Sequence, residues 1–144
     1  MEIDNTHYIS TEILSLENLK EIISKRKTLA LSDEAKVNIQ KCRDYLDAKM
    51  ASKSKPIYGI NTGFGSLCNV KISNENLSKL QENLVKSHSC GTGEEVPAAI
   101  VKLMLLLKIQ SLSYGHSGFQ LKTVERLVDF YNNNVLPVVY AQGS

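Results

Sequence analysis

The chain has 144 residues, a common length for one globular domain, and its 42% hydrophobic and 22% charged composition is ordinary for a folded protein. A net charge of +2 without a dense block of lysine and arginine argues against nucleic acid or an anionic membrane as a partner. The longest apolar stretch, residues 103–107, is far shorter than the roughly 20 residues that span a bilayer. Three widely spaced cysteines without a C-x-x-C pair, and an acidic N-terminus unlike a signal peptide, favour a reduced, cytoplasmic protein.

The first part of the chain is predicted to hold two helices. Residues 1–13 show no sustained period and are expected to be extended or partly ordered. Ser15 and Ser32 each stand before a segment with helical apolar spacing, so each is predicted to cap a helix. The second helix is expected to end near residue 51, before a polar linker at residues 52–56. The apolar face of this helix is predicted to comprise Ala35, Ile39, Cys42, Leu46 and Met50.

Three further helices are predicted in the second part of the chain. Ser73 is expected to cap the third helix, and Pro97 fits the first turn of the fourth. Residues 100–112 are apolar on nearly every face, so this helix is expected to be buried all round. Because one domain of this length rarely surrounds a helix completely, we expect the burial to occur in something larger. A fifth helix is expected to end at residues 132–134. The prediction is an all-α fold, organised as one helical domain over residues 1–144.

A loop with three glycines separates the second and third predicted helices. Residues 58–65 read Y-G-I-N-T-G-F-G, which cannot be a helix interior because each glycine there costs about 1 kcal/mol relative to alanine. We expect an active-site loop over about residues 56–72, ending in an irregular piece that could move as a flap. Such a loop would fix the directions of Tyr58 and Phe64.

The residues by themselves leave the chemistry open. Neither a dinucleotide fingerprint nor a P-loop is present, the three histidines lack the spacing of zinc ligands, and Ser117 lacks a nucleophile elbow. Tyr58 can be a packed tyrosine with a bonded hydroxyl, or a proton donor or acceptor in a site that tunes it. His88 can satisfy a carbonyl at a helix end, or bind a polar substrate.

Several segments, taken together, resemble the aromatic amino acid ammonia-lyases. Residues 58–65 resemble the family loop Y-G-[VI]-N-T-G-F-G, and residues 80–93 resemble L-Q-x-N-L-[VI]-x-S-H-[AS]-x-G-x-G. Residues 113–118 resemble the turn L-x-x-G-x-S-G, and residues 136–144 resemble the approach to the family's prosthetic group. Order and spacing agree over roughly residues 14–144. Within the family, the pattern looks most like the histidine ammonia-lyases of bacteria.

The resemblance implies a fold, a reaction and roles for individual residues. The fold would be the N-terminal helical segment of the ammonia-lyase, fumarase/aspartase-like architecture, and the reaction the elimination of ammonia from L-histidine to give trans-urocanate in histidine degradation. The resemblance assigns Tyr58 to proton transfer, His88 to recognition of the substrate ring, and Gly65 to close approach of the loop backbone. It also implies a homotetramer whose active sites are built from several subunits.

The same resemblance implies a cofactor that these 144 residues do not encode. In the family, a methylidene-imidazolone forms from an Ala-Ser-Gly triplet. The family pattern places that triplet directly after the residues that match Gly143 and Ser144. We therefore expect the chain to be part of a longer protein and to be inactive without the rest of it.

Alternatives to this interpretation remain open. A tyrosine ammonia-lyase, which gives p-coumarate, could use His88 to bind a phenol, whereas phenylalanine is disfavoured because a site built for a polar ring discriminates strongly against an apolar one. A helical protein-interaction module could instead bind a partner through residues 100–112 and the apolar tail. The interpretation as part of a lyase predicts self-association through uncovered apolar surface.

Overall fold

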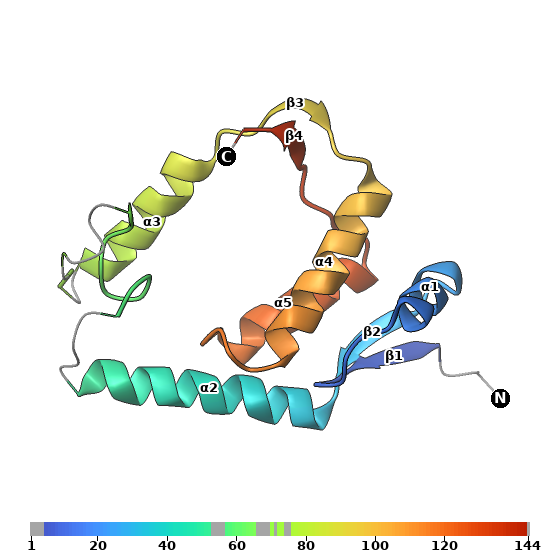
Figure 1. Ribbon diagram of the computed structural model, residues 1–144, viewed down its shortest axis with the longest axis horizontal. Coiled ribbons are helices and arrows are strands. Elements are labelled where there is room, and N and C mark those ends of the chain that lie inside the picture. The colour runs from blue at the N-terminus through green and yellow to red at the C-terminus, as the bar shows by residue number, and fades with distance from the viewer. Residues whose placement is uncertain (1–4, 53–56, 66–69, 71, 74–75, 144) are drawn as a thin grey trace. The chain divides into compact units, whose positions relative to one another are not determined.

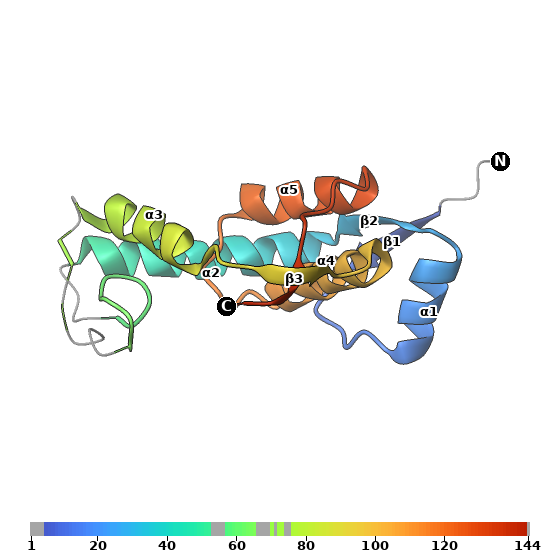
Figure 2. The same cartoon turned by 90° about the horizontal axis from the view of Figure 1, so that it is seen from above.

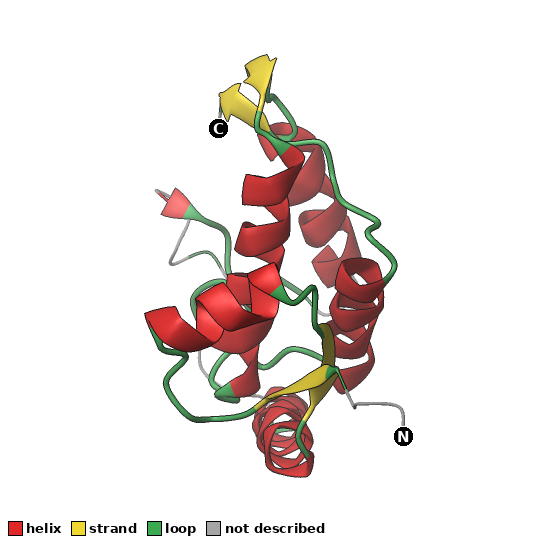
Figure 3. Ribbon diagram, turned by 90° about the vertical axis from the view of Figure 1, so that its right-hand side faces the viewer, coloured by secondary structure: helices red, strands yellow, loops and turns green. Residues whose placement is uncertain are grey.

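The computed structural model describes residues 5–52, 57–65, 70, 72–73 and 76–143, and within them the chain is mostly helical (Figure 1). The helical prediction is confirmed, but the described residues also form four short strands that the sequence did not predict. These strands make two separate two-stranded sheets, shown in yellow in Figure 3. The chain divides into two compact units: Met1–Ala48 with Val96–Val138, and Lys49–Glu95 with Val139–Ser144. The single domain over residues 1–144 stays a prediction.

The first unit begins with a strand, a helix and a second strand. Strand β1 (Thr6–Ile9) and strand β2 (Thr28–Leu31) pair in parallel and lie side by side in Figures 1 and 2, joined by helix α1 (Leu16–Ser24). The predicted cap at Ser15 is confirmed, because its hydroxyl accepts the backbone N–H of Asn18 at 3.1 Å. The expectation of extended chain near the start is confirmed at Thr6–Ile9, although the pairing of this strand with β2 was not foreseen; residues 1–4 lie outside the described residues.

Helix α2 (Asp33–Ala51) follows β2 almost at once. Its predicted cap is confirmed, since the Ser32 hydroxyl accepts the backbone N–H of Ala35 at 3.1 Å. The predicted apolar face is buried only at its start: Ala35 and Ile39 are inaccessible, whereas Cys42 and Leu46 are half-buried. The helix passes from the first unit into the second between Ala48 and Lys49, so its later turns leave the first core.

Helices α4 (Ala98–Ser113) and α5 (Leu121–Asn132) pack together and complete the core of the first unit. Burial of a leucine or isoleucine side chain contributes roughly 1.5–3 kcal/mol, so this cluster is the main source of the unit's stability. The largest fully buried apolar side chains are Ile9, Ile22, Ile39, Leu106, Ile109 and Val124. The end of α5 at Asn132 agrees with the sequence prediction.

Within the described residues, α4 is buried on one side and exposed on another, and its burial in something larger stays a prediction. Ile100, Met104 and Leu107 are 49%, 48% and 45% exposed. The opposite side of the helix, including Leu106 and Ile109, is inaccessible. Apolar residues on every face leave no polar side to mark the exposed one, so the periodicity could not show that the first unit covers only one side. Pro97 stands directly before α4 as its N-cap, one residue earlier than predicted.

Two side-chain amides join the helices of the first unit to strand β2 and to the segment that follows β1. The Asn132 side chain pairs with the backbone of Leu29, accepting its N–H at 2.8 Å and donating to its carbonyl at 2.9 Å. Gln110, which is 5% exposed, donates to the carbonyls of Ser10 and Glu12 at 3.0 and 3.2 Å. Both amides give partners to backbone groups that would otherwise lose water on folding.

The second unit contains helix α3 (Leu77–His88) and an antiparallel pair, β3 (Thr92–Glu95) with β4 (Tyr140–Gln142). The predicted cap at Ser73 is wrong, because Asn76 occupies the N-cap position and the helix begins at the following residue. Ser73 instead accepts the Asn76 side chain at 3.0 Å, an alternative local bond that serine often makes outside helices.

The described residues contain neither a candidate membrane-spanning helix nor a candidate metal site. None of their helices has the length and apolarity to span a bilayer. They also contain no group of three or more histidine, cysteine, aspartate or glutamate side chains arranged to hold a metal ion.

Candidate active site

The loop at residues 57–65 is anchored through a buried asparagine. Asn61 is 3% exposed, and its side-chain Oδ1 accepts the backbone N–H of Ile57 at 2.7 Å. The Asn61 carbonyl accepts the N–H of Ile72 at 2.9 Å. Since a buried amide must find partners inside the protein, these bonds fix both the start of the loop and its return.

The next two residues extend this anchor. Thr62 is inaccessible and its hydroxyl donates to the carbonyl of Gly63 at 2.9 Å. The N–H of Gly63 donates to the carbonyl of Val70 at 3.1 Å. The part of the expected loop at residues 56, 66–69 and 71 lies outside the described residues.

Tyr58 projects from this anchored loop toward solvent. It is 64% exposed, and its ring meets Phe64 edge to face, with ring centroids 5.9 Å apart and planes at 69°. An edge-to-face contact of this kind stabilises by about 0.5–1.5 kcal/mol and orients the ring without covering the hydroxyl. Within the described residues Tyr58 is therefore not packed in a core, and its hydroxyl is accessible.

Gly65 closes the described part of the loop in a left-handed conformation, with φ +56°. A Cβ placed on it would have no heavy atom of the described residues within 4 Å. Among the described residues, the backbone here is thus open on the side where a larger residue would add atoms, and the close approach of a substrate at Gly65 stays a prediction.

His88 is the last residue of α3 and is exposed. Its Nδ1 lies 2.9 Å from the carbonyl oxygen of Leu84 and 3.0 Å from the hydroxyl of Ser87. A carbonyl can only accept, so in this bond Nδ1 carries the proton, and in the neutral ring Nε2 then has the lone pair. The helix-end bond that the sequence allowed is therefore present, and it leaves Nε2 as the acceptor for a ligand.

The charges next to His88 on α3 are paired with one another. Glu82 lies between Lys79 and Lys86 and forms ion pairs with both. Hydrogen bonds, first from Lys86 and then from Lys79, lower the pKa of the Glu82 carboxyl. All three side chains are well exposed, so the pairs add little stability, but they offset the positive charge of Lys86 near the histidine.

The β3–β4 pair brings the end of the described chain next to the segment that follows His88. Gly143 has φ +103°, and a Cβ on it would lie 2.3 Å from the carbonyl oxygen of Cys90. A Cβ on Gly91 would lie 2.8 Å from the ring of Tyr140. Only glycine permits so close a crossing of the two backbones, so the spacing of these glycines has a direct physical reason.

The structure brings some predicted site residues together and keeps others apart. His88 is the last residue of α3, four residues before strand β3 begins at Thr92. The loop that carries Tyr58 lies beside the other end of that helix (Figures 1 and 2). No hydrogen bond or ring contact among the described residues joins Tyr58 to His88. Sequence reasoning missed the anchoring roles of Asn61 and Thr62, which two polar residues between glycines could have suggested.

The family model and the curated relatives that match this chain belong to the same family. Residues 14–144 match the family model described as aromatic amino acid lyase. The chain is 40% identical over 141 residues to a histidine ammonia-lyase of Streptococcus sanguinis, covering 96% of this chain and 27% of that protein. The chain spans about a quarter of the length of the curated relatives it matches.

Solved structures share the same fold. A histidine ammonia-lyase from Trypanosoma cruzi superposes with a TM-score of 0.83 at 33% identity, covering 96% of this chain and 27% of the other. A tyrosine aminomutase from Streptomyces globisporus superposes with a TM-score of 0.85 at 28% identity, covering 95% of this chain and 26% of the other. The backbone described above is therefore similar in enzymes named for two different amino acids.

Proposed function

Because this chain belongs to the aromatic amino acid lyase family, we propose that it is the N-terminal part of a histidine ammonia-lyase. The whole enzyme would convert L-histidine to trans-urocanate and ammonia. In that elimination the bond between Cα and nitrogen breaks, a proton leaves Cβ, and a carbon–carbon double bond forms. Identity of about 40% to curated histidine ammonia-lyases supports this substrate.

The observation that carries the proposal is the crossing of β3 and β4. It places Gly143, the last described residue, against Cys90 and Gly91, just beyond His88. The family pattern puts the Ala-Ser-Gly triplet directly after this point. The proposed substrate-binding histidine would therefore stand near the start of the cofactor-forming segment. The tight glycine crossing fits a backbone that must hold that segment in one place.

The methylidene-imidazolone formed from that triplet would supply an electrophile that makes the amino group of the substrate a better leaving group. The role that we propose for Tyr58 is proton transfer at the substrate. Its hydroxyl is exposed on a loop whose base is fixed by Asn61, so it can reach a ligand while the loop keeps its shape. A positioned acid or base of this kind contributes about 10²–10⁴-fold to rate.

His88 would select the substrate ring. With Nδ1 bonded to Leu84, its Nε2 can accept the N–H of an imidazole. The same atom can accept the O–H of a phenol, which keeps tyrosine as the competing substrate, in line with the tyrosine aminomutase of the same fold. A phenyl ring offers no such donor, so phenylalanine is disfavoured.

We further propose that the whole enzyme is a cytoplasmic homotetramer with active sites built from several subunits. Such a site would not require Tyr58 and His88 of one copy to touch. The position of the loop at residues 57–65 beside the end of α3 away from His88 is compatible with this arrangement (Figure 1).

The test of the catalytic role is Tyr58→Phe in the full-length protein, followed as urocanate formation. We expect turnover to fall by about 10²–10⁴-fold, because only the hydroxyl is removed. Tyr45→Phe is the matched control, since Tyr45 is also 64% exposed but lies on α2, and it should keep parental turnover. Turnover of Tyr58→Phe above about a tenth of the parental value would contradict the proton-transfer role.

Two further assays test the substrate and the extent of the enzyme. The full-length protein should form urocanate from L-histidine much faster than p-coumarate from L-tyrosine, and the reverse ranking would make it a tyrosine ammonia-lyase. The 144-residue chain alone should form neither product. Activity of this chain alone would refute the assignment of the electrophile to sequence beyond it.

A further inference from the structure

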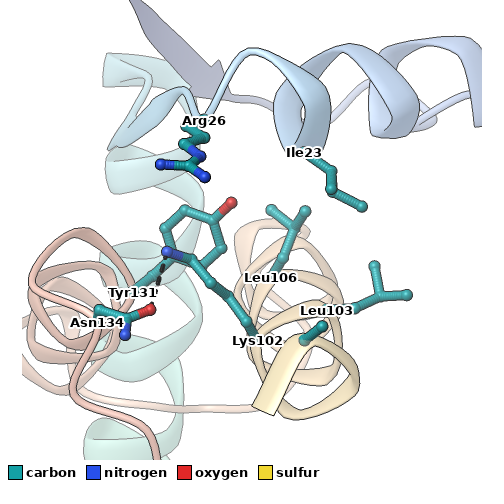
Figure 4. A pocket seen from close by; sticks show the side chains of 8 residues that line it. Ile23, Arg26, Lys102, Leu103, Leu106, Tyr131 and Asn134 are labelled. Atoms are coloured by element: carbon teal, nitrogen blue, oxygen red, sulfur yellow. Dashed lines mark hydrogen bonds between the residues drawn. The ribbon is translucent and has the colours of Figure 1, made fainter. Parts of the chain in front are cut away.

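The first unit contains a cavity that none of Tyr58, Gly65 and His88 lines. Its volume is about 450 Å³, enough for a small organic molecule. It lies where the end of α1, the first turns of α4 and the end of α5 meet (Figure 4). The lining residues are Ile23, Arg26, Ala99, Lys102, Leu103, Leu106, Tyr131 and Asn134.

One side of the cavity is cationic. Arg26 and Lys102 stand there with Tyr131, and none of the lining residues is acidic (Figure 4). Neither cation has a carboxylate within 4.0 Å in the part of the chain that the structure describes. Two cations without a carboxylate partner at one pocket form a site for an anion, because an anion there would be attracted by both.

Lys102 is held in position before any ligand arrives. Its ammonium nitrogen lies 3.2 Å from the side-chain oxygen of Asn134 and 4.6 Å from the centre of the Tyr131 ring. An ammonium has three donors, so the bond to Asn134 leaves others to point into the cavity. Burial raises the pKa of Tyr131, which keeps its hydroxyl protonated and able to donate.

The backbone at this cavity is unusual. Arg26 (φ +48°) and Asn134 (φ +55°) are the non-glycine residues with positive φ in the described chain, and both line the cavity. Each is the left-handed residue that follows a helix, as the bonds from Lys27 to Ile22 and from Val135 to Phe130 show. Glycine is the usual residue there, and a side chain such as that of arginine costs about 1–2 kcal/mol. An arginine in that position directs its guanidinium to the cavity at a cost that a ligand contact would offset.

The opposite wall is apolar. Ile23, Leu103 and Leu106 face the cations across the cavity (Figure 4). Ile23 is 50% exposed, so its apolar surface is accessible to a ligand. Leu106 is inaccessible and forms the buried end of the cavity. A ligand that fits must therefore be charged at one end and apolar at the other.

We propose that this cavity binds a small organic monocarboxylate, with its carboxylate on Arg26 and Lys102 and its apolar body against Ile23, Leu103 and Leu106. A guanidinium and an ammonium match the geometry and charge of a carboxylate. The volume accommodates an aromatic or short branched aliphatic body. The apolar wall should favour such a ligand over inorganic anions, which have no apolar body. The two cations should favour it over neutral molecules of the same shape.

The test uses the 144-residue chain at low ionic strength and neutral pH, with benzoate as the probe and backbone amide NMR shifts as the readout. Benzoate should saturate shifts at residues around Lys102 and Asn134. Benzyl alcohol has the same ring without the charge, acetate has the charge without the ring, and phosphate is an inorganic anion. Each should bind at least about tenfold more weakly than benzoate, because each loses one of the two walls.

Variants of the chain test whether Arg26 and Lys102 bind the carboxylate of benzoate. Arg26→Asn removes the guanidinium but keeps a residue that tolerates positive φ, and Lys102→Met keeps the length of the stem. Each should weaken benzoate binding by about tenfold. Ala99→Phe, at an exposed lining position, should block binding without touching either cation. Lys20→Gln, which removes one charge from α1 outside the cavity, should leave affinity within about twofold.

Each remaining outcome counts against the proposal. Absence of saturable benzoate shifts in the folded parent would overturn it, as would equal binding of benzyl alcohol, acetate or phosphate. Retained affinity in both Arg26→Asn and Lys102→Met, with spectra that show folded protein, would place any benzoate site elsewhere. Tyr58→Phe does not alter this cavity, so failure of the lyase proposal and failure of this one can be told apart.

Discussion

At the scale of single residues, two glycines with positive φ differ in what surrounds them. Gly143 (φ +103°) has the Cys90 carbonyl oxygen 2.3 Å from its Cβ position, whereas Gly65 (φ +56°) has open space there. Gly65→Ala should therefore cost only the strain of a left-handed alanine, about 1–2 kcal/mol. Gly143→Ala adds a clash between backbones that cannot be relieved by turning a side chain, so it should open the β3–β4 pair.

Amide hydrogen exchange of the 144-residue chain measures this difference directly. In Gly143→Ala, protection of the amides in Thr92–Glu95 should drop at least about tenfold, since each 1.4 kcal/mol of lost stability is a factor of ten in opening. In Gly65→Ala, protection of the same amides should be unchanged. Equal effects of the two substitutions would show that the crossing is looser than the structure indicates.

The residues of the candidate site could be predicted only in part. The glycine pattern placed Tyr58 on a loop, and the structure shows it exposed there, as a catalytic role requires. Its anchor was not recognised, because polar residues between glycines do not show by themselves that Asn61 is buried and bonded to Ile57. The exclusion of a packed Tyr58 likewise needed the fold, since periodicity says nothing about a glycine-rich segment.

At the scale of elements, the β1–β2 pair makes the stability of the first unit depend on pH. His7 lies half-buried in β1, opposite Leu29 of β2. Burial first, and the positive charge of Lys27 second, lower the pKa of His7 below its usual value near 6.5, against an opposing effect of Glu21. The folded state thus binds fewer protons than the unfolded state around that pH. Stability is therefore full above pH 6.5 and falls as the pH drops below it.

Urea unfolding at pH 7.5 and pH 5.5 tests this sign, with one proton contributing at most about 1.4 kcal/mol per pH unit. The free energy of unfolding of the parent should be lower at pH 5.5. His7→Gln should lose part of that pH dependence, because glutamine does not titrate. An NMR titration that places the pKa of His7 at or above 6.5 would contradict the prediction, as would an unchanged pH dependence in the variant.

Helices were predicted far better than strands, for a physical reason. Helices α1, α2 and α5 have caps or apolar periods that lie within the segment itself, such as Ser15 and Ser32. Each strand has at most four residues, too few for an alternating pattern to stand out. Pairing of β1 with β2, and of β3 with β4, depends on tertiary contact between distant segments. Ser73 failed as a cap for a different, local reason, because its hydroxyl accepts the side chain of Asn76, which itself occupies the N-cap position.

At the scale of the whole molecule, the two compact units separate the two proposed activities. The first unit holds the cavity with Arg26 and Lys102, and the second holds Tyr58, Gly65 and His88. The sequence alone gave no sign of this division, because the segments of each unit are far apart in the chain. The closest indication in the sequence was helix α4, which is apolar on every face. Part of its apolar surface is exposed in this chain.

That surface leads to a prediction about assembly. Ile100, Met104 and Leu107 are each about half exposed and lie along one side of α4 at spacings of four and three residues. The chain spans about a quarter of the length of its curated relatives. We therefore expect a second copy of the 144-residue chain to cover this stripe, because contiguous exposed apolar surface drives association. Sedimentation velocity should show a weight-average mass that rises with concentration.

Substitutions identify the face that associates. Met104→Glu puts a charge in the centre of the stripe and should weaken self-association by at least about tenfold, since an unpaired charge would be buried in the contact. Val37→Glu is the control, because Val37 is 63% exposed on α2 and lies outside the stripe, and it should associate like the parent. A parent chain that stays monomeric at all concentrations would contradict the prediction. That result would favour the helical interaction module, which binds a different protein. Equal weakening by both substitutions would mean that net charge, rather than the α4 stripe, controls assembly.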